Sequence, residues 1–240
     1  MKKLFILIIC SFLFSPSMKA QPILFKKLGT LLSKDILAKA NEDLKSKPIT
    51  VTAFHSERSA GGKHDFFSEA DYWWPDASNP TGPYIQKDGQ TNPANFSEHR
   101  LAMIRFSQMV GNLTSAYLLT KDNKFALKAI QHCKAWFVDT ATKMNPSLLY
   151  AQAIKGKVTG RGVGIIDMIQ MIEVAQSIMV LEKQNAIKSD DFVEIKKWFQ
   201  QYLQWVTTHP YGIDEREAKN NHGTCWTMQV AVFANLVNDT

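Results

Sequence analysis

The 240-residue sequence predicts an all-α fold, and three features carry that prediction. Apolar residues recur at helical spacing in six segments, no stretch alternates with period two for long enough to indicate a sheet, and the breaks concentrate between residues 47 and 97. The composition is 45% apolar, 11% aromatic and 21% charged, which excludes a disordered chain, a collagen-like repeat and a small disulfide scaffold. The length allows one large domain or two small ones.

The first twenty residues predict a secretory signal peptide. Lys2 and Lys3 precede an apolar run over residues 4–14, and small or turn-forming residues lead to a cleavage site near Ala20. The run is well short of the ~20 residues that a membrane-spanning helix needs. We therefore expect a periplasmic or secreted protein whose mature part is residues 21–240, with no membrane partner after signal cleavage.

The charge of the mature chain excludes one class of partner. Removing residues 1–20 takes away three lysines and no acid, so the net charge falls from +6 to +3, and no block of Lys or Arg remains. Nucleic acid is therefore a poor partner, whereas an anionic polysaccharide suits a modest positive charge. The six histidines show no metal-ligand spacing, so we expect no metal and no cofactor. Cys133 and Cys225 would be able to pair in an oxidising compartment.

The helical pattern predicts the elements in order. The expected helices cover residues 27–44, 99–120, 123–143, 163–183, 190–208 and 224–237. Asp122 and Ser189 supply N-cap chemistry for two of them. Successive amphipathic helices indicate a bundle, a solenoid or an α/α toroid. No short repeat is visible, which disfavours the solenoid.

The irregular stretch over residues 47–97 holds five of the nine prolines. It includes polar residues such as Arg58 and His64, followed by the aromatic run that contains Trp73 and Trp74. One interpretation is a loop folded over the core, with the rings as anchors. The other is a sugar-binding wall, in which aromatic faces stack on pyranose rings and basic groups bind carboxylates and hydroxyls.

Two short motifs border the expected helices. Asn221 and His222 lie just before the last expected helix, whose N-terminus favours an anion, so that they would hold a carboxylate and move a proton. Alternatively, Asn221 only caps the helix and His222 is a surface residue. The glycine-rich run at residues 160–164 has Ile165 where a dinucleotide loop needs a sixth-position glycine, so it indicates a tight helix start with Arg161 facing a cleft. Cys225 is interpreted as a buried helix cysteine rather than a nucleophile.

Taken together and in this order, these segments resemble the alginate lyase family of secreted bacterial polysaccharide lyases, whose fold is an α/α toroid. The matching pieces are residues 58–66, 71–75, 82–85, 88–89, 92–93, 99–100, 150–154, 160–167 and 220–224.

The resemblance implies β-elimination at a uronic acid in a polymer such as alginate. This reaction needs a group that neutralises the uronate carboxylate, a base for the C5 proton and an acid for the departing O4. By similarity, Asn221 would help to neutralise the carboxylate, and His222 would neutralise it or act as the base. The candidate substrate-binding residues are Arg58, His64, Trp73, Trp74, Gln152 and Arg161.

The chain also departs from the family pattern. Family members carry an acid tyrosine and a helping arginine downstream of the Asn-His pair, and the eighteen residues after His222 contain neither. We therefore expect a chain that lacks the C-terminal part of its toroid. Two alternatives follow: an inactive or non-catalytic module that binds uronate polysaccharide, and an α/α-toroid glycoside hydrolase. The hydrolase would need a pair of catalytic carboxylates, for which Asp65, Glu69 and Asp71 are available.

Overall fold

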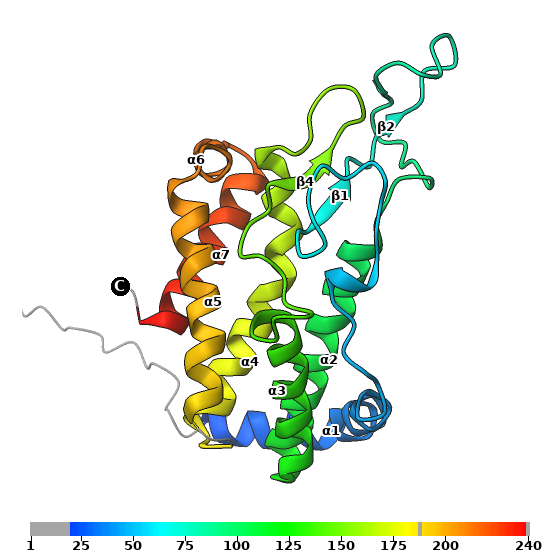
Figure 1. Cartoon of the computed structure of the whole chain (residues 1–240). Coiled ribbons are helices and arrows are strands. Elements are labelled where there is room, and N and C mark those ends of the chain that lie inside the picture. The colour runs from blue at the N-terminus through cyan, green and yellow to red at the C-terminus, as the bar shows by residue number, and fades with distance from the viewer. Residues whose placement is uncertain (1–19, 187–188, 239–240) are drawn as a thin grey trace, which may run out of the picture.

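The computed structural model describes residues 20–186 and 189–238, and within them it confirms the all-α fold. The predicted signal peptide, residues 1–20, lies outside the described residues except for Ala20. Most of the helices stand side by side with their long axes aligned (Figure 1). The α-helices of the described residues are α1 (Ala20–Asp43), which runs across the base of the view, α2 (Glu98–Thr120), α3 (Asn123–Phe137), α4 (Met171–Lys183), α5 (Ser189–Thr208), α6 (Pro210–Glu217), which is seen end-on, and α7 (Asn221–Val237).

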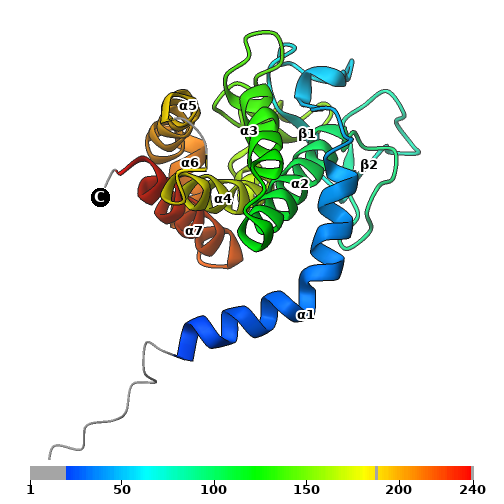
Figure 2. The ribbon, with the colours of Figure 1, turned by 90° about the horizontal axis from the view of Figure 1, so that it is seen from below.

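Contacts between neighbouring helices are consistent with an all-α toroid. Helix α2 packs against α1, α3 and α4, while α7 packs against α4 and α5. Seen from below, α1 runs along the outside, with its C-terminal half beside α2 (Figure 2). The segment Gly162–Lys183 is long and apolar enough to cross a membrane by length and composition alone. Half of it is buried, and its Val174, Ile178 and Leu181 are fully enclosed in the protein core.

Several details of the predicted helices are wrong. Helix α1 begins at Ala20 rather than at residue 27, and α7 begins at Asn221 rather than at residue 224. Helix α3 ends at Phe137 rather than at residue 143, because the chain turns at Asp139, whose carboxylate accepts a hydrogen bond from the Ala141 amide at 2.9 Å. The start of the predicted 163–183 helix is a 3-10 helix, η2 (Gly162–Gln170). Helix α6 was not predicted at all; it begins at Pro210, and His209 caps it.

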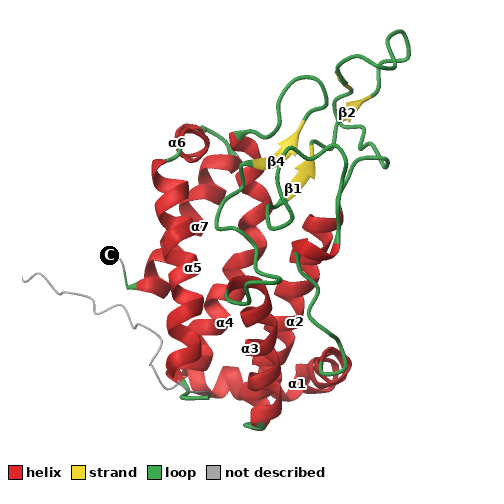
Figure 3. Ribbon diagram, in the orientation of Figure 1, coloured by secondary structure: helices red, strands yellow, loops and turns green. Residues whose placement is uncertain are grey.

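Short strands gather at the end of the molecule where α2 and α7 begin (Figure 3). Strand β1 (Phe67–Glu69) pairs in parallel with β4 (Tyr150–Ala153), and β2 (Trp73–Trp74) pairs antiparallel with β3 (Ile85–Gln86). None of these strands exceeds four residues, so each is too short for its sequence to show a period-two pattern. The pairing of β1 with β4 connects the long irregular segment to a strand some eighty residues downstream.

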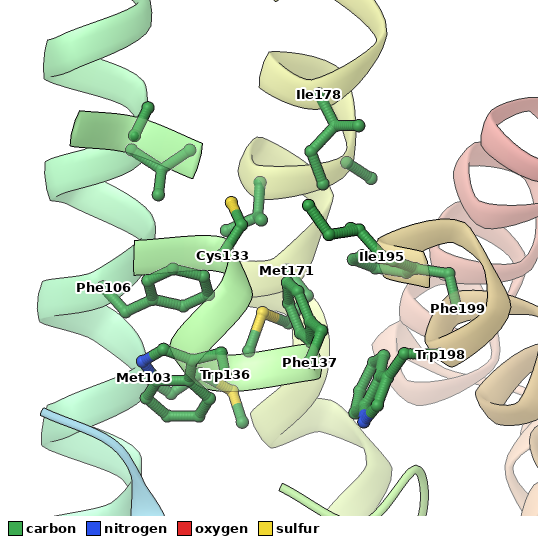
Figure 4. Close-up of a cluster of buried hydrophobic side chains, with 14 of the residues drawn as sticks. Met103, Phe106, Cys133, Trp136, Phe137, Met171, Ile178, Ile195, Trp198 and Phe199 are labelled. Atoms are coloured by element: carbon green, nitrogen blue, oxygen red, sulfur yellow. The ribbon is translucent and has the colours of Figure 1, made fainter. Parts of the chain in front are cut away.

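The core lies between α2, α3, α4 and α5 and is rich in aromatic side chains (Figure 4). Trp136 is fully buried and stacks on Phe106 with ring centroids 4.8 Å apart, and its Nε1 donates to the Ile49 carbonyl at 3.0 Å. Phe137 packs against Trp198, with the centroids of the two rings 4.7 Å apart. Cys133, also in this cluster, and Cys225 in α7 are both buried and unpaired, so the disulfide did not form.

A histidine on α3 should make stability depend on pH. His132 is fully buried, and neither of its ring nitrogens has a hydrogen-bond partner among the described residues. Burial, with a smaller contribution from Lys128, lowers the pKa of His132 to about 4. Because the unfolded chain binds the proton more readily, stability falls as the pH drops from the unfolded pKa of about 6.5 towards the folded one.

We expect this histidine alone to cost about 3 kcal/mol of unfolding free energy across that range. Denaturant unfolding of the wild type and of His132→Phe at about pH 7 and about pH 4.5 measures the contribution as a difference of differences. The variant should lose clearly less stability on acidification, and equal losses in both proteins would contradict the assignment.

Candidate active site

A cleft of about 490 Å³ opens at the end of the molecule where α2 and α7 begin. We call it the main cleft. Its apolar floor comes mostly from η2, and one edge is formed by Tyr72 and Trp73 of the irregular segment. Besides Tyr72, the polar side chains that line it are Asp71, Gln86, Arg100, Gln152, Arg161, Asp167, Gln170 and His222.

His222 is positioned by the start of α7. Asn220 is the N-cap of this helix, and its side-chain oxygen accepts a hydrogen bond from the His222 amide at 3.0 Å. The cap fixes the backbone at the second residue of the helix and so directs the imidazole into the main cleft. The alternative in which Asn221 caps the helix is therefore wrong by one residue.

Glu215 of α6 contacts Nδ1 of the His222 imidazole. Its carboxylate Oε2 is 3.0 Å from Nδ1 of His222, and its side chain is only 3% exposed. Burial raises the pKa of Glu215, an effect opposed by His222 and, more weakly, by Arg161. A carboxylate at Nδ1 selects the tautomer that donates from Nδ1, which leaves Nε2 as the acceptor in the neutral ring.

Arg100 joins the irregular segment to the cleft floor. Its Nη1 donates to Asp71 at 2.8 Å, and its Nε lies 3.2 Å from the carboxylate of Asp167. The other oxygen of Asp167 accepts from the Ser68 hydroxyl at 2.7 Å. Burial raises the pKa of Asp167, and Arg100 opposes that rise. The ion pairs therefore fasten β1 and the loop after it to α2 and η2.

Arg161 and Gln152 line the cleft together. The Arg161 guanidinium donates to the backbone carbonyl and to the side-chain oxygen of Gln152, both at 3.1 Å. Gln152 has a φ of 53°, in the left-handed region that non-glycine residues seldom adopt. A Cβ at Gly160 would meet the Leu149 carbonyl at 1.9 Å, so glycine is required where residues 160–164 pass β4. The interpretation of this run as a tight helix start with Arg161 facing a cleft agrees with the structure.

The structure brings together four of the eight sequence-predicted site residues, namely Trp73, Gln152, Arg161 and His222. Asn221 is exposed at the start of α7 and does not line the main cleft. The others lie outside this cleft and have local partners. Arg58 forms a two-pronged ion pair with Glu69, at 2.6 and 2.7 Å.

The remaining two candidates bind backbone carbonyl groups. His64 Nδ1 lies 2.6 Å from the Lys143 carbonyl, and Trp74 Nε1 donates to the Gln90 carbonyl at 2.8 Å. These contacts hold the irregular segment in place. They agree with the interpretation in which this segment is a loop folded over the core and anchored by its rings. Trp73 alone of the two tryptophans lines the cleft.

Four charged residues of the cleft region were not among the predicted site residues, namely Asp71, Arg100, Asp167 and Glu215. The first three belong to the motifs that matched the family, and those matches were the signal that would have found them. Glu215 lies seven residues before His222, across the break between α6 and α7, where no single helical period relates them. Its role became visible only in three dimensions.

The comparisons with known proteins bear on the family and the fold. Residues 50–240 match the family model for alginate lyase. The fold is similar to the crystal structure of an alginate lyase from Bacteroides ovatus, with a TM-score of 0.79 and 37% sequence identity. That match covers 86% of this chain and 55% of the other, so the chain spans little more than half the length of the solved relative. No curated protein sequence matches significantly. On the family match and the shared fold, the chain belongs to the alginate lyase family.

Proposed function

We propose that the protein is a secreted polysaccharide lyase that cleaves a uronate-containing polymer such as alginate by β-elimination. One observation carries the proposal: a histidine backed by a buried carboxylate shares a single cleft with two arginines and an aromatic wall. Family membership and the similar alginate lyase structure support it. The N-terminal twenty residues support export to the periplasm or the exterior.

The proposed reaction begins with the acidity of the C5 proton. While the neighbouring carboxylate is charged, removing this proton would add a second negative charge, so a cation must first neutralise the carboxylate. Arg161 directs two donors at Gln152 and has further N–H groups for a ligand. Its position in the main cleft suits it to bind the uronate carboxylate.

His222 is then placed to act as the base. With Nδ1 donating to Glu215, Nε2 accepts the C5 proton, and the carboxylate of Glu215 stabilises the imidazolium that forms. The electron pair of the C–H bond becomes the C4–C5 double bond, and the C4–O4 bond breaks. O4 keeps the electron pair of that bond and takes a proton from water, and the sugar that lost the C5 proton becomes an unsaturated uronate at the new non-reducing end.

The geometry favours elimination over hydrolysis. A hydrolase needs two carboxylates that face the scissile bond. Asp71 and Asp167, the carboxylates that line the main cleft, are both engaged by Arg100, and Asp167 is 4% exposed. Asp65 and Glu69 are not part of that lining, and Glu69 is bound to Arg58.

Ultraviolet absorbance tests the proposal directly, because the unsaturated product absorbs and a hydrolysis product does not. The mature chain should produce rising absorbance with alginate or with a glucuronan, and none with a neutral glucan. New reducing ends without absorbance would instead show a hydrolase. Retention in a polyuronate gel without either product would show a binding module.

Replacing Trp73 by alanine should weaken substrate binding more than it slows the chemical step. The ring lines the main cleft, so its loss removes an apolar surface for a pyranose. We expect KM to rise about fivefold to tenfold, as for one aromatic contact, with kcat changing little. Trp74→Ala is the matched control, because that ring lies outside the cleft. An equal rise in KM for both variants would indicate loop disruption instead.

A further inference from the structure

A short hairpin over residues 154–158 lies directly after β4 and next to the main cleft. Ile154 and Val158 exchange backbone hydrogen bonds at 2.9 and 3.1 Å. Gly156 turns the chain with a φ of 74°, and it lies so close to Pro83 that a Cβ would be 2.8 Å from the proline Cα. The hairpin is therefore held against the irregular segment.

The hairpin carries two lysines on aromatic rings. Lys157 Nζ lies 5.3 Å from the ring centre of Trp73, and Lys155 Nζ lies 5.6 Å from that of Tyr84. Both lysines are exposed, and neither forms an ion pair within the described part of the chain. The rings restrain the stems of the two side chains, and the positive charges remain available to a ligand.

A second cavity, the side cleft, is formed in part by this hairpin. It has a volume of about 670 Å³ and is lined by residues 153–160 together with Glu57, Arg58, Phe67, Glu69 and Tyr211. Successive residues of β4 separate the two cavities, since Gln152 lines the main cleft and Ala153 the side cleft. Lys157 lines the side cleft and contacts Trp73, which lines the main cleft. The two cavities therefore meet at this lysine–tryptophan contact.

The charges of the side cleft favour an anion at the hairpin. Arg58 is paired with Glu69 at 2.6 Å, so the lining charges that remain are those of Lys155 and Lys157, two positive, and of Glu57, one negative. Lys155 and Lys157 are the lining cations that no described acid pairs. A polyuronate carries one carboxylate on every sugar, so a polymer that leaves the main cleft past Trp73 presents its next carboxylates to these lysines.

We propose that the hairpin is an outer subsite, in which Lys157 and then Lys155 bind carboxylates of the uronate residues that flank the reacting sugar, and the polymer continues into the side cleft. This inference rests on the proposed function, because it takes the substrate to be a polyuronate. On this proposal, the affinity for substrate depends on substrate length. A long chain would contact the lysines of the side cleft, and a short oligosaccharide confined to the main cleft would not.

Charge-removing variants test the subsite. Lys157→Gln should raise KM for long polyuronate about fivefold, the loss that corresponds to one exposed ion pair, and Lys155→Gln should add to it. The rise for a trisaccharide should be much smaller. The matched control is Lys121→Gln, which removes the same charge and a similar lysine–ring contact, 5.3 Å from the Tyr117 ring, at the opposite end of α2. This control should behave like the wild type.

The outcomes separate the subsite from the reaction. If the wild type eliminates and Lys157→Gln keeps the wild-type KM for polymer, the subsite is overturned while the proposed function stands. If the wild type binds polyuronate in an affinity gel without eliminating, weaker retention of Lys157→Gln than of Lys121→Gln supports the subsite and overturns the lyase activity. Equal retention of the two variants, or no retention of the wild type, overturns the subsite.

Discussion

His222→Ala should lower the rate of elimination at least about a hundredfold, the lower bound for losing a general base. The variant removes the one imidazole that lines the main cleft and leaves Glu215 buried at 2% exposure without its partner. The measurement is the rate of ultraviolet absorbance on saturating polyuronate, which reports kcat. A folding control by circular dichroism accompanies it, because loss of the partner could also disturb α6.

Glu215→Gln separates proton transfer from folding. The amide keeps an oxygen within reach of Nδ1 at the wild-type spacing of 3.0 Å but removes the negative charge that stabilises the imidazolium. We expect an intermediate loss of kcat with little change in KM, and a pH profile that differs from that of the wild type.

For the His222→Ala variant, a folded protein that turns over substrate at the wild-type rate would remove His222 from the mechanism.

Trp136→Ala should be among the most damaging core substitutions, at about 3 to 5 kcal/mol of unfolding free energy. The indole is fully buried, stacks on Phe106 and donates to the Ile49 carbonyl, so its removal leaves a cavity and an unpaired acceptor. Denaturant unfolding measures the loss.

Trp136→Phe is the graded control for the same site. It keeps a ring against Phe106 and removes the donor to Ile49, so we expect a loss of about 1 kcal/mol from the missing hydrogen bond, plus a smaller packing loss. If the alanine and phenylalanine variants were equally stable, ring packing would contribute nothing here and the description of the core would be wrong.

Helices that begin at a local signal were predictable from the sequence. Asp122 caps α3 through the Lys124 amide at 3.0 Å, and the predicted start at Asn123 is correct. The end of α3 was not predictable in the same way, because the apolar pattern runs on past the turn at Asp139. Apolar periodicity indicates which face is buried, whereas hydrogen bonds to distant segments decide where a helix ends.

The site was predictable where chemistry and motif coincide. His222 and Arg161 combine a functional side chain with a helix start, and both line the main cleft. Arg58 and His64 looked equally suitable in sequence, yet Glu69 and the Lys143 carbonyl bind them. The partner of a charged group lies wherever the fold brings it, so no reading of residues 58–64 alone would have revealed these bonds.

The parallel pairing of β1 with β4 has a consequence for the order of events during folding. Ser68 reaches Asp167 across 99 residues, and the cleft also needs His222, so its parts are delivered by segments from most of the described chain. Forming contacts between segments so far apart in the sequence costs more chain entropy than forming a local helix. These contacts are therefore expected to form late in folding. A partly synthesised chain would then carry helices but no cleft. Binding of a ligand in the cleft would accordingly indicate that the whole domain has folded, not only some of its helices.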